Sequence, residues 1–300
     1  MSTPSQAAAA ANVAKDRPKD QPDGRVQTAL RLRAENRLTE ALNLLSPPGD
    51  YAQDVYTLRG DLQRDLGQLY EAVGSYSTVI ALDPQNTYAH QNLAGCLRKL
   101  GRWSAAADAL RKLLEGDSYS DAARIALGEC LLQLNKSEEA LACFEACWSE
   151  AALAPALLGK AVALQLLRRF EESESLYLRF LELHPHSEEA LRNLIALSME
   201  MFDLARAERY ANQLLQRDSQ SVAALQALTV VEFERHSYES AAAYYGRLLE
   251  IIPEEKLMHG GNDDVFEYRL SGKSRDLLNK TRHENITRHD RFQPARRAGR

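Results

Sequence analysis

Residues 56–84 read YTLRGDLQRDLGQLYEAVGSYSTVIALDP and contain the pattern that decides the fold. Their small residue, Ala72, is followed after four positions by Tyr76 and after seven by Val79. Offsets of four and seven place side chains on one face of a helix. A second helical pattern lies upstream of Ala72, and Gly67 supports a tight turn between the two helices. The stretch therefore predicts a pair of packed helices.

The small residue recurs along the chain at a nearly constant interval. Successive copies are 31, 34, 34, 33, 34 and 34 residues apart: Ala41, Ala72, Ala106, Ala140, Ser173, Ala207 and Ala241. A second series follows four residues later: Leu45, Tyr76, Leu110, Phe144, Tyr177, Ala211 and Tyr245. A third follows after three more: Val79, Leu113, Cys147, Phe180, Leu214 and Leu248. A generic helical bundle has no reason to repeat small residues at one period, so we expect stacked helix pairs.

The clearest copy of the repeat carries ten pattern residues: Tyr56, Arg59, Gly60, Leu66, Gly67, Leu69, Ala72, Tyr76, Val79 and Pro84. It resembles the tetratricopeptide repeat, whose pattern is W-x2-L-G-x2-Y, then A-x3-F and a closing proline. The resemblance implies an all-α fold, a right-handed α-solenoid (superhelix) of about seven antiparallel helix pairs. The predicted units are 22–52, 53–86, 87–120, 121–153, 154–187, 188–221 and 222–255. Gly60 would let the neighbouring helix approach closely.

The two ends differ from the repeats. Residues 1–21 are rich in Ala, Pro, Ser, Asp and Lys and predict a disordered tail. Residues 256–270 predict a connector and a short capping helix, and residues 271–300 form a basic tail with nine basic and three acidic side chains. Because the whole chain has a net charge of −5, the repeats must be acidic.

The basic tail allows three interpretations. It is a solvated, disordered segment, or it docks on the acidic repeats near Asp54, Asp61 and Asp65, or it contacts the phosphates of a nucleic acid. The arginines that would make such contacts are Arg288, Arg291, Arg296, Arg297 and Arg300.

No pattern of residues indicates catalysis. The sequence has no phosphate-binding glycine loop, nucleophile elbow or zincin motif, so we expect neither an enzyme nor a cofactor. Cys130, Cys143 and Cys147 could hold a soft metal, as could His184 with His186, but such cysteines are more often small core residues and we predict no metal site.

The cysteine content and the N-terminus predict the compartment. Four cysteines in 300 residues, all in predicted helices, do not form a disulfide framework. The N-terminus lacks the apolar core of a signal peptide, and no apolar run has the roughly 18 residues of a membrane span. We expect a cytoplasmic protein without a membrane span.

The resemblance also implies a binding surface, because the first helix of each tetratricopeptide pair lines the concave groove. The groove residues it implies are Tyr88, Gln91, Asn92, Arg98, Lys99, Ile125, Leu132, Leu158, Val162, Leu166, Arg192, Asn193, Met199, Val230 and Phe233. This groove is charged in the early units and apolar from unit four onward. Apolar residues in a row often mark an interaction surface. If the register is shifted by one, these residues are core instead.

Two known subtypes of the tetratricopeptide family match this sequence poorly. Chaperone-binding members hold a terminal carboxylate with basic groove residues, which are missing from the corresponding positions here: Thr57, Asp61, Asn92, Ala122 and Ala126. Members with an asparagine ladder are matched only at Asn92 and Asn193.

The sequence therefore predicts a non-catalytic scaffold or adaptor that binds a peptide or amphipathic helix of a protein partner in the groove. The alternatives are a nucleic-acid-associated factor that uses the basic tail, and a chaperone-like or accessory subunit of an enzyme or secretion complex. Neither the partner, the pathway nor the oligomeric state follows from the sequence.

Overall fold

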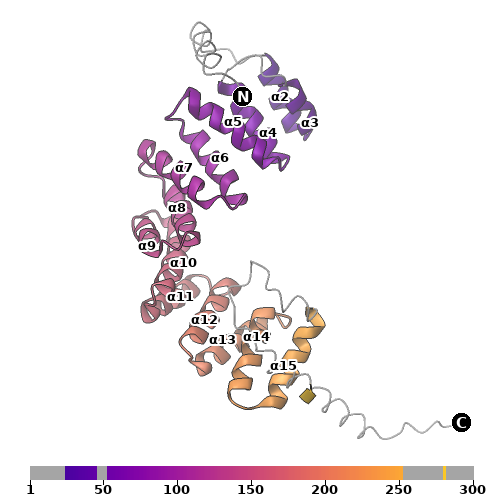
Figure 1. Cartoon of the computed structure of the whole chain (residues 1–300), viewed down its shortest axis with the longest axis vertical. Helices are drawn as coiled ribbons and strands as arrows, with labels where there is room; N and C mark the ends of the chain where they lie inside the picture. The colour runs from indigo at the N-terminus through magenta and orange to yellow at the C-terminus, as the bar shows by residue number, and fades with distance from the viewer. Residues whose placement is uncertain (1–23, 46–52, 253–279, 282–300) are drawn as a thin grey trace, which may run out of the picture. The chain divides into compact units, whose positions relative to one another are not determined.

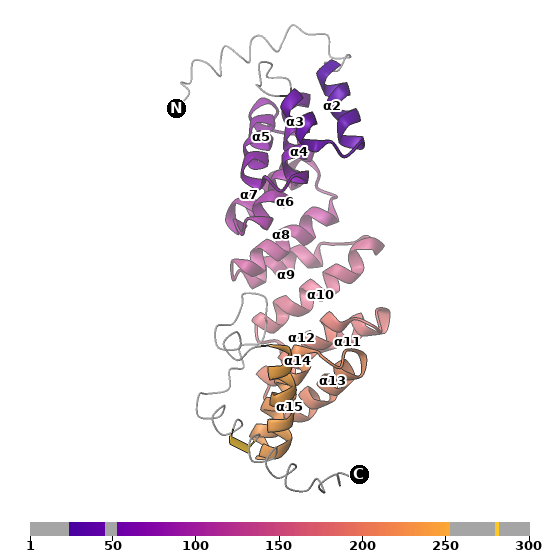
Figure 2. The ribbon, with the colours of Figure 1, turned by 90° about the vertical axis from the view of Figure 1, so that its right-hand side faces the viewer.

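The computed structural model describes residues 24–45, 53–252 and 280–281. In these ranges the chain is all-α, as predicted, and contains no strand. Within each of the two compact units described below, consecutive helices lie antiparallel (Figures 1 and 2). The predicted tail 1–21, the capping segment 256–270 and nearly all of the tail 271–300 lie outside the described residues.

Each pair consists of a first helix and a second helix. The first helices are α2 (Gly24–Ala34), α4 (Gln53–Asp65), α6 (Thr87–Lys99), α8 (Asp121–Gln133), α10 (Glu150–Leu166), α12 (Glu188–Glu200) and α14 (Val222–Glu234). The second helices are α3 (Leu38–Leu44), α5 (Leu69–Leu82), α7 (Trp103–Gly116), α9 (Ser137–Glu145), α11 (Phe170–Leu183), α13 (Leu204–Arg217) and α15 (Tyr238–Ile251). The boundaries of the repeat units themselves remain a prediction.

The turn inside each pair has one recurring conformation. A residue five positions before the small residue adopts a positive φ between 57° and 76° in every described pair: Asn36, Gly67, Gly101, Asn135, Arg168, Phe202 and His236. In the second pair the Gly67 N–H donates to the Arg64 carbonyl at 3.0 Å and the Gln68 N–H to the Gln63 carbonyl at 2.8 Å. This left-handed turn satisfies carbonyls at the end of the first helix and reverses the chain.

The periodic residues form the core. All seven small residues have no exposed surface, which lets the first and second helices cross closely. Tyr76, Tyr177 and Tyr245 of the second series are among the largest fully buried side chains. A Cβ atom added at Gly60 would lie 2.7 Å from the Tyr76 ring, so Gly60 permits the predicted close approach.

The fourth pair departs from the period. Helix α9 ends at Glu145, so Cys147, which the spacing predicts for the core, is only half-buried. Asp121, at the start of α8, instead holds the segment that follows α9. Its carboxylate accepts hydrogen bonds from the backbone N–H groups of Trp148 (3.2 Å) and Ser149 (2.8 Å). Helix α10 then begins at Glu150, one turn earlier than the predicted unit boundary at 154.

The chain divides into two compact units, Met1–Ala163 and Leu164–Arg300. The described core of the first unit includes Leu110, Leu131 and Phe144. The second unit has its own core around Leu225 and Tyr245. No helix in the described ranges combines the length and apolarity that crossing a membrane requires.

Candidate functional site

Polar side chains link successive first helices in the first unit. Arg33 of α2 reaches α4, where its guanidinium donates to Asp65 at 2.7 and 2.9 Å. Arg64 of α4 reaches Asn92 of α6 in the same way. Arg98 of α6 then pairs with Glu129 of α8. Each link joins one repeat to the next, so the face formed by these first helices is polar and internally connected.

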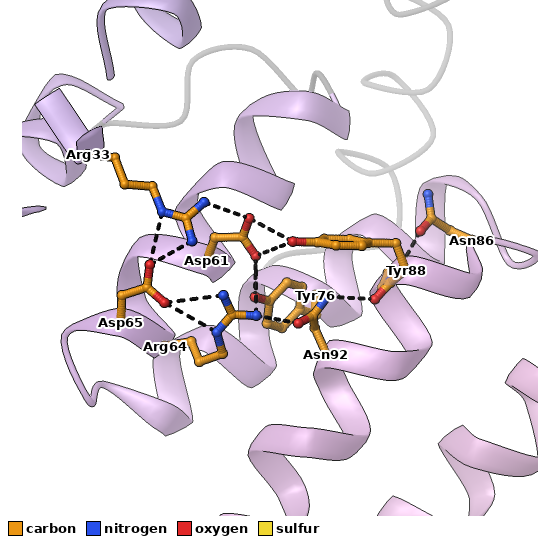
Figure 3. Close-up of polar contacts among 9 residues, drawn as sticks. Arg33, Asp61, Arg64, Asp65, Tyr76, Asn86, Tyr88 and Asn92 are labelled. Carbon is orange, nitrogen blue, oxygen red and sulfur yellow. Dashed lines mark hydrogen bonds and ion pairs between the residues drawn. The ribbon is translucent and has the colours of Figure 1, made fainter. Parts of the chain in front are cut away.

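Asp61 lies at the centre of this network (Figure 3). Its carboxylate is buried, with 6% of the residue exposed. Tyr76 Oη donates to it at 2.7 Å, and Tyr88 Oη lies 2.9 and 2.8 Å from its two oxygens. Arg33 Nη1 donates at 3.2 Å and Arg64 Nη1 lies 3.7 Å away. A buried carboxylate needs such partners, because an unpaired one would not remain charged.

The two tyrosines remain protonated donors. Burial raises the pKa of Tyr76 far above its ordinary value, and the hydrogen bond to Asp61 raises it further. Burial and Asp61 also raise the pKa of Tyr88. Because the hydroxyl protons are retained and both are donated to Asp61, the two tyrosines hold this carboxylate in place.

A pocket of about 340 Å³, here called the α4–α8 pocket, opens beside this network. It is lined by Arg64, Gln91, Asn92, Ala94, Gly95, Cys96, Arg98, Lys99, Leu110, Ser120, Ala122, Ala123 and Ala126. The first helices α4, α6 and α8 supply all of these residues except Leu110 and Ser120. Their side chains are brought together because consecutive first helices pack side by side.

The α4–α8 pocket is positively charged. Arg64, Arg98 and Lys99 line it and no Asp or Glu does. Arg64 is balanced by Asp65 at 3.2 Å, and Arg98 is balanced by Glu129. Lys99 forms no ion pair in the described part of the chain, and the buried Nε of Arg98 finds no hydrogen-bond acceptor there. Because the Nε of Arg98 is buried, Lys99 is the cationic side chain that a ligand can reach and pair with.

The shape of the pocket comes partly from Gly95. A Cβ atom added at Gly95 would meet no atom within 4 Å, so the space above this residue is open. Cys96 beside it is fully buried, and burial raises the pKa of its thiol. A neutral, buried thiol is a poor nucleophile.

Four residues predicted for the groove, Gln91, Asn92, Arg98 and Lys99, line this pocket. Tyr88 lies beside it and is held by Asp61. Both polar ends of the Asn92 amide are already used, because Oδ1 accepts from Arg64 and Nδ2 donates to the Tyr88 carbonyl at 2.9 Å. Asn92 is thus occupied within the chain and does not present the free amide of an asparagine ladder.

Two residues of the predicted apolar groove of units four to seven are covered. Met199 and Val230 are buried, with 1% and 6% exposed, so neither is accessible to a ligand. They are core because α12 and α14 are apolar around most of their circumference. The other predicted apolar residues are half-buried, except Leu166 with 51% exposed: Ile125, Leu132, Leu158, Val162 and Phe233. Arg192 is exposed and Asn193 half-buried.

Two further predictions concern docking of the basic tail and a metal site. Asp61 and Asp65, suggested as docking points for the basic tail, are already neutralised by Arg33 and Arg64. The tail arginines from Arg288 onward lie outside the described residues. Within the described ranges, no group of three His, Cys, Asp or Glu side chains is placed to hold a metal ion.

Sequence reasoning missed Arg64 as a site residue. The bond of Arg64 to Asn92 and its place in the pocket depend on the neighbouring repeat. The signal available in the sequence was the coincidence of three cations on two successive first helices.

Comparisons with known proteins agree with the helical-repeat fold. The family model described as anaphase-promoting complex, cyclosome, subunit 3, which is of the tetratricopeptide type, matches residues 65–147. A crystal structure of a tetratricopeptide repeat protein from Parabacteroides merdae has a TM-score of 0.61, with 19% identity over 86% of this chain and 97% of that one. The chain has the tetratricopeptide-repeat fold.

Two further solved structures share the fold. PilW, a type IV pilus biogenesis factor, has a TM-score of 0.59 and 19% identity, covering 67% of this tetratricopeptide-repeat chain and 94% of its own. YrrB, described as having an unusual peptide-binding site, has a TM-score of 0.51 and 17% identity, covering 63% and 96%. No curated protein matches the chain by sequence. Likeness at this identity establishes the fold, which is typical of protein-interaction scaffolds.

Proposed function

We propose that this tetratricopeptide-repeat protein is a non-catalytic scaffold that binds an acidic segment of a partner protein in the α4–α8 pocket. The observation that carries the proposal is the charge of the pocket. Three cationic side chains line it without a lining carboxylate, and the exposed Lys99 has no ion-pair partner in the described chain. A carboxylate of the partner is the group that fits these donors.

The expected gain is sufficient for recognition. A hydrogen bond to a charged group contributes about 1.5–3 kcal/mol, and Lys99 has no carboxylate partner in the described chain that a ligand would have to displace. Because Arg64 and Arg98 are held by Asp65 and Glu129, little side-chain entropy remains to be lost on binding. The bound carboxylate meets donors that are already in place.

A peptide suits this pocket better than a small metabolite. Its walls are helix surfaces, and its apolar part consists mainly of small residues such as Ala122 and Ala126. About 340 Å³ accommodates one acidic side chain with part of the adjoining backbone. YrrB, which shares the fold, is described as having a peptide-binding site, and this is consistent with the proposal.

The test selects a phage-displayed library of random peptides on the full-length protein. We expect enrichment of Asp and Glu in the recovered peptides, because they complement Lys99 and Arg98. The variant Gly95→Leu, which fills the open space above the pocket, should lose these peptides, whereas Gly95→Ala should retain them. Recovery of the same peptides by Gly95→Leu, or the absence of acidic enrichment, would show that the pocket is not the binding site.

A further inference from the structure

A second surface depression is formed by second helices of the helix pairs, in the unit Leu164–Arg300. It is a groove of about 570 Å³ between the second helices α11 and α13. Its lining residues are Glu174, Leu178, Leu181, Arg206, Arg209, Tyr210 and Gln213. The residues of the α4–α8 pocket come from another part of the chain, so this groove is a separate surface.

The other repeats provide an internal comparison for this groove. One position after the small residue, most repeats carry an apolar residue: Leu42, Val73, Ala107, Leu141 and Ala242. The fifth and sixth repeats instead carry Glu174 and Glu208. An apolar contact has therefore been replaced by a carboxylate where the groove opens.

Leu178 also differs from the other repeats, but it is apolar where they are small or polar. Five positions after the small residue, the other repeats carry small or polar residues: Ser46, Ser77, Arg111, Glu145, Asn212 and Gly246. Leu178 is the large apolar residue at this position, and 40% of it is exposed. A leucine at a position that is otherwise polar or small gives the groove an apolar wall, which Leu181 continues.

The acidic side of the groove is neutralised internally. Glu174 accepts a hydrogen bond from Arg206 Nη1 at 2.6 Å and from Tyr210 Oη at 3.2 Å. Arg206 also pairs with Asp203 at 3.0 Å. Both oxygens of Glu174 are thus occupied, and the groove does not repel an anionic ligand as a free carboxylate would.

Arg209 supplies the free positive charge. Its guanidinium lies over the Tyr210 ring, 4.8 Å from the centroid, and donates to Tyr210 Oη at 3.1 Å. In the described part of the chain it has no carboxylate partner. The stacked ring holds the guanidinium in place and leaves its other donors for a ligand.

We propose that the α11–α13 groove docks an amphipathic helix of a second partner protein. Apolar side chains of that helix contact Leu178 and Leu181, and an Asp or Glu about one helical turn away pairs with Arg209. Charge complementarity and the exposed Leu178 favour this kind of helix. A basic helix would be repelled by Arg209 and Arg206, and a purely polar helix would leave Leu178 exposed. The scaffold then has one peptide site on its first helices and another on its second helices.

The repeats also supply substitutions that the fold accepts. Leu178→Ser introduces the residue that the second repeat has at this position, and Arg209→Ala introduces the residue of the fourth and seventh repeats. Both side chains lie at the surface, so the double variant should keep the melting temperature of the parent. Asn212→Ser, at the position of Leu178 in the next repeat, is the matched control because Asn212 is exposed and does not line the groove.

The experiment selects a phage-displayed library of helix-forming peptides on the full-length Gly95→Leu variant, in which the α4–α8 pocket is filled. We expect recovered peptides to combine leucine-like residues with an Asp or Glu one turn away. Binding should weaken about tenfold or more with Leu178→Ser/Arg209→Ala, as for a central interface residue, and remain unchanged with Asn212→Ser. Because Gly95→Leu is the parent, the outcome does not depend on the pocket.

Two results would overturn the proposal. One is that no helical peptide is recovered, and the other is that recovered peptides bind the double variant within about twofold of the parent, a difference too small for a central contact. If the selection on the unmodified chain recovers no peptides enriched in Asp and Glu, that result bears only on the α4–α8 pocket.

Discussion

At the scale of single residues, Asp61 shows how one carboxylate joins several helices. Its partners Arg33, Arg64, Tyr76 and Tyr88 come from α2, α4, α5 and α6. Leaving a buried group without one of its hydrogen bonds costs about 1–3 kcal/mol. The network therefore fixes the orientation of Arg64, which lines the α4–α8 pocket, and connects the stability of the first repeats to the shape of the site.

Gly128 is packed tightly in the core, and a substitution there tests this packing. A Cβ atom added there would lie 2.6 Å from the Phe144 ring, which has no exposed surface and cannot move away. We expect Gly128→Ala to lower the free energy of unfolding by about 1–3 kcal/mol, as overpacking does. Gly95→Ala, with open space around its Cβ, should leave it unchanged or raise it by about 0.5–1 kcal/mol. Urea denaturation followed by circular dichroism measures both, and equal effects would contradict the packing described here.

Asp121 makes a pH-dependent contribution. Hydrogen bonds from Ser149 and then Trp148 and Arg124 lower the pKa of Asp121 from 3.8 to about 2. Because the folded pKa is depressed, the stabilisation is present above the unfolded value and is lost as the pH falls from 3.8 toward 2. Asp121→Asn should thus be less stable than the parent near neutral pH.

The difference between these two proteins should shrink on acidification through that range. Urea unfolding of both at several pH values measures it, and the other carboxylates cancel because both proteins contain them. A difference that stays constant down to the folded pKa would mean that the Asp121 charge does not hold the α9–α10 connection.

At the scale of elements, the turn inside each pair is the most regular feature. Its left-handed residue is glycine in two pairs and asparagine in two, but Arg168, Phe202 and His236 occupy it in the second compact unit. A left-handed conformation costs roughly 1–2 kcal/mol for a residue with a side chain. The second unit therefore carries strain in three consecutive turns that the first unit avoids.

Phe202 is the best place to test this strain. Its φ is 57° and 61% of the residue is exposed, so removing its ring loses little burial. We expect Phe202→Gly to raise the free energy of unfolding by about 1 kcal/mol. Thermal and urea denaturation measure the change, and Gly101→Ala, made at the same turn position of an earlier pair, should change it in the opposite direction. A loss of stability in Phe202→Gly would show that the ring packs better than its exposure indicates.

The elements also show what could be predicted from the sequence. The small-residue period predicted the helix pairs, and all its residues from Ala41 to Ala241 are buried. Met199 and Val230 were assigned to the groove by repeat position, yet their helices are apolar on several sides and both residues are core. Asp61 was read as a groove charge, but its burial depends on side chains from three other helices. The repeat period shows which face of its helix a residue occupies. Side-chain contacts between repeats also depend on which side chains the neighbouring helices carry.

At the scale of the whole molecule, the chain has a helical-repeat fold with two compact units. The first unit contains the α4–α8 pocket and the second contains the α11–α13 groove. Each site is built by neighbouring repeats alone, as expected where a repeat contacts only its neighbours. Changes in one site should therefore leave the other intact, which allows the two binding surfaces to be tested separately.

The central claim, that the α4–α8 pocket recognises a carboxylate, is tested most directly by isothermal titration calorimetry. The ligands are an acidic peptide selected on the full-length protein and the same peptide with each Asp and Glu replaced by Asn and Gln. We expect the amide peptide to bind at least about tenfold more weakly, because it lacks charge-assisted hydrogen bonds to Arg98 and Lys99. Binding of the acidic peptide should also be lost with Gly95→Leu and kept with Gly95→Ala. Equal affinity for the acidic and amide peptides would contradict the claim.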